Sequence, residues 1–128
     1  MDLATQNHLT ALRELLTYRL RELRAEIGAA EQARGPASAV PAHEVVDRKD
    51  EAAQRQELEL AGAQEERDID EMAEVEAALG RLDAGVYGDC VDCGEPIPVQ
   101  RLLVQPAARR CAGCQAQHEA AVHRAGHG

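Results

Sequence analysis

Leucine and isoleucine residues near the start of the chain recur at intervals that define one face of a helix. They stand three or four residues apart, at Leu9, Leu12, Leu16, Leu20, Leu23 and Ile27. A mean period of about 3.5 residues is typical of a helix that packs along a partner in a coiled coil. The spacing therefore predicts one long helix from about residue 5 to residue 34, which Gly35-Pro36 ends.

A weaker apolar seam follows, and it predicts a second long helix from about Val46 or Asp50 to Asp83. Glu65 interrupts this seam, whose other positions are Leu58, Ala61, Ile69, Met72, Val75 or Glu76, Leu79 and Leu82. Proline and small residues between the two helices predict a loop from Gly35 to His43. Two helices of roughly 45–50 Å joined by such a loop should fold back as an antiparallel hairpin.

Composition also favours helices and argues against a thick globular core. The chain has no Phe or Trp, two Tyr, and 45% apolar and 29% charged residues. Aromatic side chains supply much of the buried area of globular cores, so this chain must rely on aliphatic residues. We see no apolar stretch of membrane-span length and no secretory signal at the N-terminus. The expectation is a cytoplasmic protein that does not enter a membrane.

Four cysteines carry the strongest chemical signal. Cys90 and Cys93 are separated by two residues, as are Cys111 and Cys114, and seventeen residues lie between the pairs. Two such knuckles place four thiolates around one tetrahedral ion, which suits Zn²⁺ and leaves no open position for catalysis. We therefore expect one structural zinc ion. One alternative is a redox dithiol. Another is that His118, His123 and His127 serve as spare ligands. A short final helix is predicted from Ala112 to about His123.

These patterns divide the chain into a hairpin over residues 1–83, with its tip at about residues 35–52, and a zinc module over residues 84–128. The net charge of −9 lies in the second part of the hairpin, because residues 44–83 hold fourteen acids and five bases while residues 1–43 and 84–128 are each balanced. Nucleic-acid phosphates are bound through Lys and Arg, so this surface argues against broad DNA or RNA binding. At the tip, Asp47 and Asp50 precede Ala52, and acids near a helix start ordinarily act as a cap or a dipole partner.

The zinc segment reads Tyr87-Gly88-x-Cys90-x-x-Cys93-Gly94-x-x-Ile97-x-x-x-Arg101-Leu102-x-x-x-Pro106, followed by Cys111-x-x-Cys114-Gln115. Over these roughly thirty residues it resembles the DksA/TraR family of C4 zinc-finger proteins. The hairpin that precedes it has the length and place expected of that family. The family's tip pattern D-x-x-D-x-A matches Asp47, Asp50 and Ala52.

The resemblance implies a mainly α fold: a long antiparallel coiled-coil hairpin, a small C4 zinc-ribbon-like module and a short C-terminal helix. It implies bacterial RNA polymerase as the partner, without direct DNA binding. In the family, the hairpin enters the secondary channel, its acidic tip approaches the active centre, and the zinc part rests on the channel rim. The implied effect is to destabilise open promoter complexes and so to modulate initiation.

One departure concerns the alarmone guanosine tetraphosphate. The positions that align with the family's basic contacts to this nucleotide are Glu74, Gln105 and Gln115, and none carries a positive charge. The resemblance therefore does not extend to alarmone binding.

The predicted function is a polymerase-binding transcription regulator without enzyme activity. The alternative is a zinc-ribbon adaptor whose coiled coil binds another protein or dimerises. An enzyme is disfavoured because no Ser/His/Asp set, phosphate loop or open metal site is visible in the sequence. A nucleic-acid-binding ribbon would have to rest on four arginines that four acids balance, namely Arg101, Arg109, Arg110 and Arg124.

Overall fold

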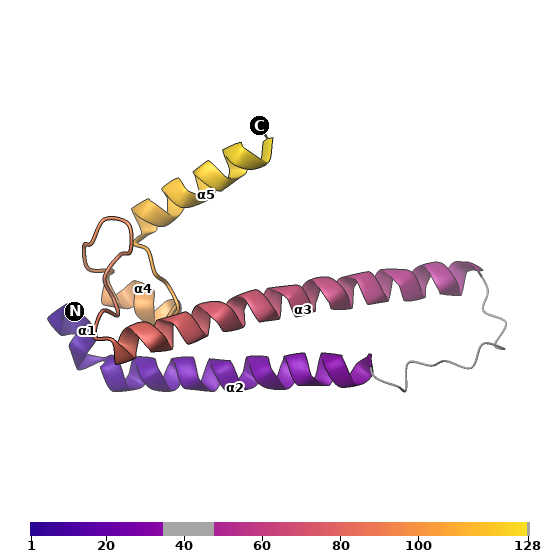
Figure 1. Ribbon diagram of the computed structural model, residues 1–128, viewed down its shortest axis with the longest axis horizontal. Coiled ribbons are helices and arrows are strands. Elements are labelled where there is room, and N and C mark those ends of the chain that lie inside the picture. The colour runs from indigo at the N-terminus through magenta and orange to yellow at the C-terminus, as the bar shows by residue number, and fades with distance from the viewer. Residues whose placement is uncertain (35–47, 128) are drawn as a thin grey trace. The chain divides into compact units, whose positions relative to one another are not determined.

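The computed structural model describes residues 1–34 and 48–127, and helices account for most of them (Figure 1). Within this part of the chain there is no strand, and the only ladder contact is an isolated bridge between Asp89 and Pro96. The mainly α fold predicted from the sequence is confirmed. The helices are α1 (Leu3–Asn7), α2 (Leu9–Ala33), α3 (Arg48–Asp83), α4 (Val99–Val104) and α5 (Ala112–His127).

The first predicted helix is interrupted near its start. Residue His8 separates α1 from α2, and its ring Nδ1 hydrogen bonds to the Ala4 carbonyl at 2.9 Å. The His8 backbone N–H turns instead to Thr5 O at 3.1 Å, a tighter bond than the α-helical pattern makes. The His8 side chain thus bonds to the Ala4 carbonyl, which would accept the His8 backbone N–H in a continuous helix.

The bounds of α3 agree with the predicted second helix, whereas α5 extends to His127, beyond the predicted end at about His123, and α4 was not predicted. The predicted loop 35–43 lies outside the described residues.

Packing divides the chain into two compact units, which we describe separately. The first comprises residues 1–19 and 74–128, and the second comprises residues 20–73. Helices α2 and α3 each contribute to both units. The division into a hairpin over residues 1–83 and a module over residues 84–128 remains a prediction. No helix in the described ranges is long and apolar enough to cross a bilayer.

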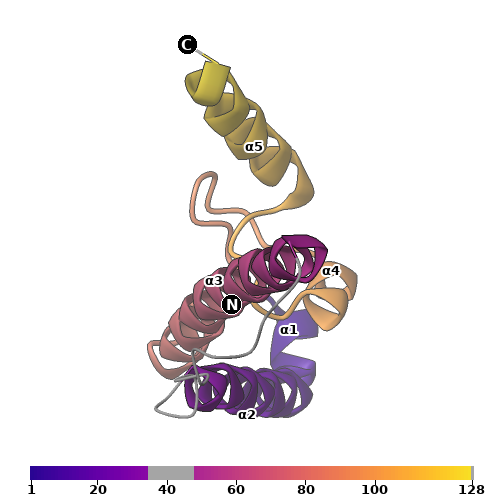
Figure 2. The same cartoon turned by 90° about the vertical axis from the view of Figure 1, so that its right-hand side faces the viewer.

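In the first unit, the start of α2 lies antiparallel to the end of α3. Arg13 Nη1 is 3.0 Å from Asp83 Oδ1, an ion pair that joins the two helices. Helices α1 and α4 lie beside each other near this pair (Figures 1 and 2). The core of the unit is almost entirely aliphatic and includes Leu12, Leu16, Val75, Ala78, Leu82, Tyr87, Ile97 and Leu102.

In the second unit, the end of α2 lies antiparallel to the middle of α3. Arg34 Nη2 is 2.6 Å from Glu65 Oε1, and the Glu65 side chain is 9% exposed. Leu20 and Leu23 of α2 are buried. The antiparallel helix pair expected from the two seams is therefore present in both units.

The seam of α3 differs from the predicted one in register. The buried positions are Glu65, Asp68, Val75, Ala78 and Leu82, whereas the Ile69 side chain is 44% exposed. Asp68, whose Oδ1 accepts a 2.9 Å hydrogen bond from Gln64 Nε2, takes the place that the sequence analysis gave to Ile69. The apolar Ile69 was predicted for this position, but the helical spacing of the buried residues places Asp68 there.

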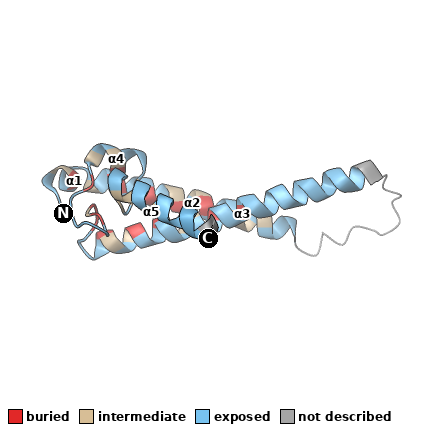
Figure 3. Cartoon of the chain, turned by 90° about the horizontal axis from the view of Figure 1, so that it is seen from above, coloured by how far each residue is buried: buried red, intermediate tan, exposed pale blue. Residues whose placement is uncertain are grey.

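The first half of α3 does not bury the apolar positions predicted for it. Leu58 is 69% exposed, and residues 50–64, including Ala61, are exposed throughout (Figure 3). Helix α2 ends at Ala33, and Arg34 already pairs with Glu65. The earlier turns of α3 thus have no counterpart on α2, which explains why this part of the seam prediction is wrong.

Helix α3 ends at Asp83, as predicted from the sequence, and glycines follow shortly after. Gly85 has a φ of +74°, its N–H donates to Leu82 O, and the Val86 N–H donates to Arg81 O. This pair of bonds is a Schellman motif, which requires a left-handed residue that glycine supplies without strain. The chain then turns directly into the first cysteine knuckle.

Gly88→Ala is expected to lower the free energy of unfolding of the zinc-loaded protein by about 2–3 kcal/mol. Gly88 has a φ of +87°, and a Cβ there would lie 3.0 Å from Thr5 Cγ2 and 3.6 Å from Leu102 Cδ1. The substitution combines left-handed strain with a collision in the packing of α1 and α4. Thermal and denaturant unfolding would measure the loss.

Two other glycines separate these causes. Gly85→Ala adds the same kind of strain with no atom within 4 Å of the new Cβ, so it should cost about 1 kcal/mol. Gly62→Ala, inside α3 with no neighbour within 4 Å, should stabilise the helix by roughly 0.5–1 kcal/mol. Equal stability of the Gly88→Ala and Gly85→Ala variants would show that contact with Thr5 carries no cost.

Candidate metal centre

The first knuckle is a short hairpin that folds back on itself. The Ile97 N–H donates to Gly88 O at 2.8 Å, and the Cys90 N–H donates to Glu95 O at 2.8 Å. Gly94, with a φ of +76°, completes the turn and donates its N–H to Cys90 O at 2.9 Å. Glycine allows the backbone to turn there without the strain that a side chain would bring. This turn directs Cys90 and Cys93 toward the same point.

The second knuckle spans the start of α5. Cys111 directly precedes the helix, Cys114 lies in its first turn, and the Gln115 N–H donates to Cys111 O at 2.9 Å. The free N–H groups and dipole of a helix N-terminus favour nearby thiolates. A backbone bond links the two knuckles, because the Val91 N–H donates to Arg109 O at 2.9 Å.

The four sulfur atoms have the spacing that a tetrahedral zinc ion requires. All four Sγ atoms lie within 4.8 Å of one another, and those of Cys93 and Cys111 are 4.0 Å apart. With Zn–S bonds of about 2.3 Å, the edges of a tetrahedron of sulfurs measure roughly 3.8 Å. The four cysteines thus form the site of a single structural zinc ion. A bound zinc ion would draw the two knuckles together and hold the fold of this segment.

The thiols differ in acidity in a way that favours a cation among them. Burial alone would raise the pKa of Cys90, but backbone N–H groups of Cys93, Cys111 and Asp92 near its sulfur lower that pKa to about 6. The neighbouring thiols of Cys111 and Cys90 raise the pKa of Cys114 to about 12. Successive thiolates repel one another at these distances, so all four can ionise together only when a positive ion joins them.

The apolar residues of the zinc-segment pattern are buried around the knuckles. Tyr87, Ile97 and Leu102 are fully buried, and the Tyr87 hydroxyl donates to Pro106 O at 2.7 Å. Burial raises the pKa of Tyr87 to about 12, although the positive charge of Arg81 acts in the opposite direction. This bond ties the loop after α4 to the end of α3.

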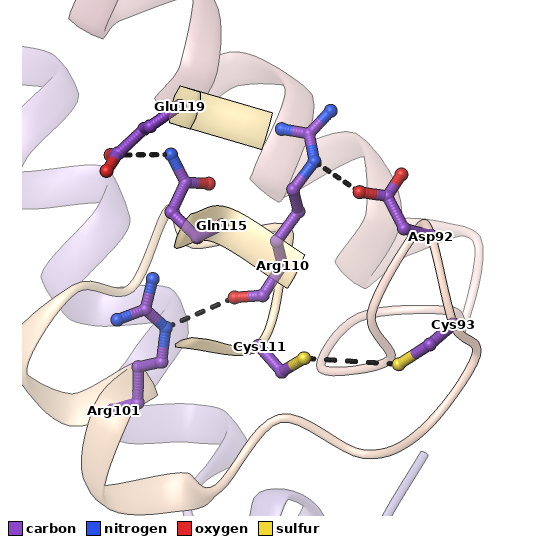
Figure 4. Close-up of polar contacts among 7 residues, drawn as sticks. All are labelled: Asp92, Cys93, Arg101, Arg110, Cys111, Gln115 and Glu119. Carbon is purple, nitrogen blue, oxygen red and sulfur yellow. Dashed lines mark hydrogen bonds and ion pairs between the residues drawn. The ribbon is translucent and has the colours of Figure 1, made fainter. Parts of the chain in front are cut away.

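A set of polar side chains surrounds the second knuckle (Figure 4). Arg110 Nε donates to Asp92 Oδ2 at 2.7 Å, and Arg101 Nε donates to Arg110 O at 3.1 Å. Gln115 Nε2 donates to Glu119 Oε1 at 3.0 Å along α5. Arg101 and Arg110 were predicted to be surface charges balanced by acids, and their bonding within the module was not predicted.

Two of the other candidate ligands are not part of the cysteine cluster. Within the described ranges, the group of residues able to hold a metal consists of the four cysteines alone. His118 and His123 lie on α5 and are not members of that group, and nothing is described of the His127 side chain. The cysteine set predicted from the sequence is the one that the structure brings together.

The tip residues are separate from the metal centre in sequence and belong to the other unit. Asp50 is the third residue of α3, and both Asp50 and Ala52 are exposed. Asp50 lies inside the first turn, where a carboxylate interacts favourably with the helix dipole. Asp47 lies outside the described residues.

Comparison with known proteins gives a consistent family. The profile described as the prokaryotic dksA/traR C4-type zinc finger matches residues 85–120. The RNA polymerase-binding transcription factor DksA of Haemophilus influenzae is 36% identical over 69 residues, which cover 54% of this chain and 48% of that protein. An uncharacterized protein of Aquifex aeolicus is 40% identical over 52 residues, or 41% of this chain and 36% of that one. The matched part thus spans about half or less of each curated relative.

A solved structure extends the likeness to nearly the whole chain. The transcription factor DksA2 from Pseudomonas aeruginosa superimposes with a TM-score of 0.72 at 28% sequence identity, over 95% of this chain and 88% of that one. The zinc-finger profile, the Haemophilus influenzae relative and the structural match all name DksA-like proteins. The four cysteines gathered at one point thus lie in the segment that matches the dksA/traR C4-type zinc finger, and the chain as a whole is similar in fold to a DksA transcription factor.

Proposed function

We propose that this protein binds bacterial RNA polymerase and inserts the end of its helix pair into the secondary channel to modulate initiation complexes. The observation that carries the proposal is the structural likeness to the transcription factor DksA2 over 95% of the chain. The curated relatives from Haemophilus influenzae and Caulobacter vibrioides are named as RNA polymerase-binding transcription factors. The proposed role takes place in the cytoplasm and requires no catalysis by the chain.

The exposed first half of α3 supports this role. Residues 50–64 are exposed, and a single helix with its side chains is about 10–12 Å wide, which suits a narrow channel. Residues 48–64 carry four acids and three bases, so this end is close to neutral, and the acid excess lies further along, at residues 65–76. The proposed action of Asp50 therefore rests on its individual position and not on a strongly acidic tip.

The arginines of the zinc module give little support to a DNA-binding ribbon. Arg110 is paired with Asp92, and Arg101 donates to a backbone carbonyl of the same module. Phosphate binding needs several free cationic groups on one face. Two of the four arginines on which that reading rested are thus engaged internally.

Competition binding tests the proposal directly. Zinc-loaded full-length protein is labelled and titrated with core RNA polymerase, with and without a protein that blocks the secondary channel. The expected result is saturable binding that the blocker displaces, together with no shift of promoter DNA at physiological salt. Binding that the blocker leaves unchanged would favour the adaptor reading, and binding to DNA alone would favour the ribbon reading.

We predict little or no synergy with guanosine tetraphosphate. Glu74 and Gln105 are exposed, and Gln115 donates its side-chain amide to Glu119, so these positions offer no cation to a phosphate. Charge-assisted hydrogen bonds are worth roughly 1.5–3 kcal/mol each, and several would be missing. Arg101, a potential substitute, is already bonded to Arg110 O.

Transcription from a sensitive promoter, with a polymerase whose other alarmone site is disabled, measures this synergy. The wild-type protein should change transcription to the same extent with and without the nucleotide. The triple variant Glu74→Lys, Gln105→Arg, Gln115→Lys should gain a nucleotide response, because it restores the cationic set. A strong response of the wild-type chain would contradict the prediction and would point to a different set of basic contacts, with Arg67 or Arg109 as candidates.

A further inference from the structure

Arg109 and Arg110, the two residues before Cys111, each accept a hydrogen bond at the backbone carbonyl from another part of the module. On one side, the Val91 N–H of the first knuckle donates to Arg109 O at 2.9 Å. On the other, Arg101 Nε of α4 donates to Arg110 O at 3.1 Å. Cys111 follows immediately, so these bonds fix the backbone from which the third sulfur projects.

Arg110 also reaches across to the first knuckle with its side chain. Its Nε donates to Oδ2 of Asp92, which stands between Cys90 and Cys93, at 2.7 Å (Figure 4). The Arg110 side chain is 11% exposed and that of Asp92 is 45% exposed. Exposed ion pairs contribute little because solvent screens them, but this guanidinium is mostly withdrawn from water. The pair therefore joins the two halves of the metal site through side chains as well as through the backbone.

We propose that Arg110 and Asp92 form a clamp between the two knuckles and set how long zinc stays bound. Release of the ion requires the knuckles to separate, and the clamp opposes that separation. The positive charge of Arg110 also lies close to a centre in which four thiolates outweigh one divalent cation. Arg110 is a positioning residue in this proposal, since it acts on the cysteines and not on the metal. The proposal concerns zinc retention and does not depend on the polymerase partner.

Zinc transfer to a colorimetric chelator tests the clamp on the full-length, zinc-loaded protein. Arg110→Met and Asp92→Asn should each release zinc roughly 10-fold faster or more, as expected when a group that orients metal ligands is lost. Arg109→Met is the matched control, because it removes the same charge from the neighbouring exposed position. Its release rate should equal that of the wild type.

A double variant and a cobalt spectrum distinguish the clamp from general loosening. Arg110→Met combined with Asp92→Asn should release zinc no faster than Arg110→Met alone, because both substitutions remove the same interaction. The thiolate-to-metal absorption bands of Co²⁺-loaded variants should match the wild type, since all four ligands remain. If Arg110→Met does not fold, Arg110→Lys and Asp92→Asn provide the same comparison.

Three results would overturn the proposal. One is equal release from the Arg110→Met and Arg109→Met variants, which would reduce Arg110 to a surface charge. Another is multiplicative acceleration in the double variant, which would show that the two residues act separately. The third is a changed Co²⁺ spectrum in Asp92→Asn, which would mean that Asp92 affects the ligand set itself.

Discussion

Cys90→Ser or Cys111→Ser is expected to abolish zinc binding and to unfold the zinc module while most helix content remains. Zinc binding in small C4 sites supplies about 10–16 kcal/mol at neutral pH, and that binding energy is folding energy. The segment that contains the knuckles has few fully buried side chains of its own, chiefly Tyr87, Ile97 and Leu102. Without the ion, the four sulfurs within 4.8 Å of one another have nothing to hold them together.

Metal analysis, far-UV circular dichroism and hydrogen exchange would measure these effects separately. Helices α2 and α3 have 25 and 36 residues, against 6 and 16 in α4 and α5, so the dichroism should fall only modestly. Exchange should rise sharply over residues 84–123. Ala112→Ser, next to a ligand and exposed, should change none of the three measurements.

Tyrosine ionisation provides an independent test of the same change. The pKa of Tyr87 is raised to about 12 in the folded module, and it should return to about 10 once the module unfolds. An ultraviolet titration of the Cys→Ser variant should therefore show this phenol ionising at lower pH. A metal-free protein with native exchange, native Tyr87 ionisation and full polymerase affinity would refute a structural role for zinc.

Zinc retention should also depend on pH with a definite sign. The ion binds thiolates, so each thiol loses its proton on binding and protons compete with zinc as the pH falls. Zinc should be held firmly in neutral and alkaline solution and lost progressively on acidification.

Periodic and local signals in the sequence predicted most of the fold. The α2 seam at Leu12, Leu16, Leu20 and Leu23 is buried as expected, because apolar spacing on a helix directly encodes the contact face. The cysteine spacing predicted the metal site because two residues between cysteines leave few alternatives to a knuckle. The predicted end of the second helix at Asp83 is also confirmed, and Gly85 shortly after it has a positive φ.

Other features depend on contacts that the sequence does not encode locally. Asp68 is buried next to exposed Ile69, so the polarity of the residues predicted the wrong position of the seam. The helix break at His8 coincides with a single side-chain bond to Ala4. The Asp92–Arg110 pair joins residues eighteen positions apart, and nothing in either residue marks the other as its partner. Such pairs appear only after the knuckles have folded.

Asp50→Asn is expected to abolish most of the effect of this protein on open promoter complexes while leaving its affinity for RNA polymerase nearly unchanged. This prediction rests on the proposed function, in which the end of α3 acts within the secondary channel after the rest of the protein has docked. Asp50 is exposed and lies in the first turn of α3, so the substitution removes one charge with little change in shape. The lost interaction with the helix dipole is worth only about 0.3–1 kcal/mol, too little to unfold a helix of 36 residues.

Open-complex lifetime and polymerase affinity must be measured on the same variants. Glu51→Gln is the matched control, since Glu51 is also exposed and also lies in the first turn, and it should keep the wild-type effect on lifetime. Equal loss in both variants would assign the effect to charge near the helix start and not to Asp50. A parallel loss of affinity would make Asp50 an anchoring residue, and full activity of Asp50→Asn would leave it only its role in the first turn of α3. Because affinity is measured separately, failure of this prediction would leave the proposed binding to polymerase standing.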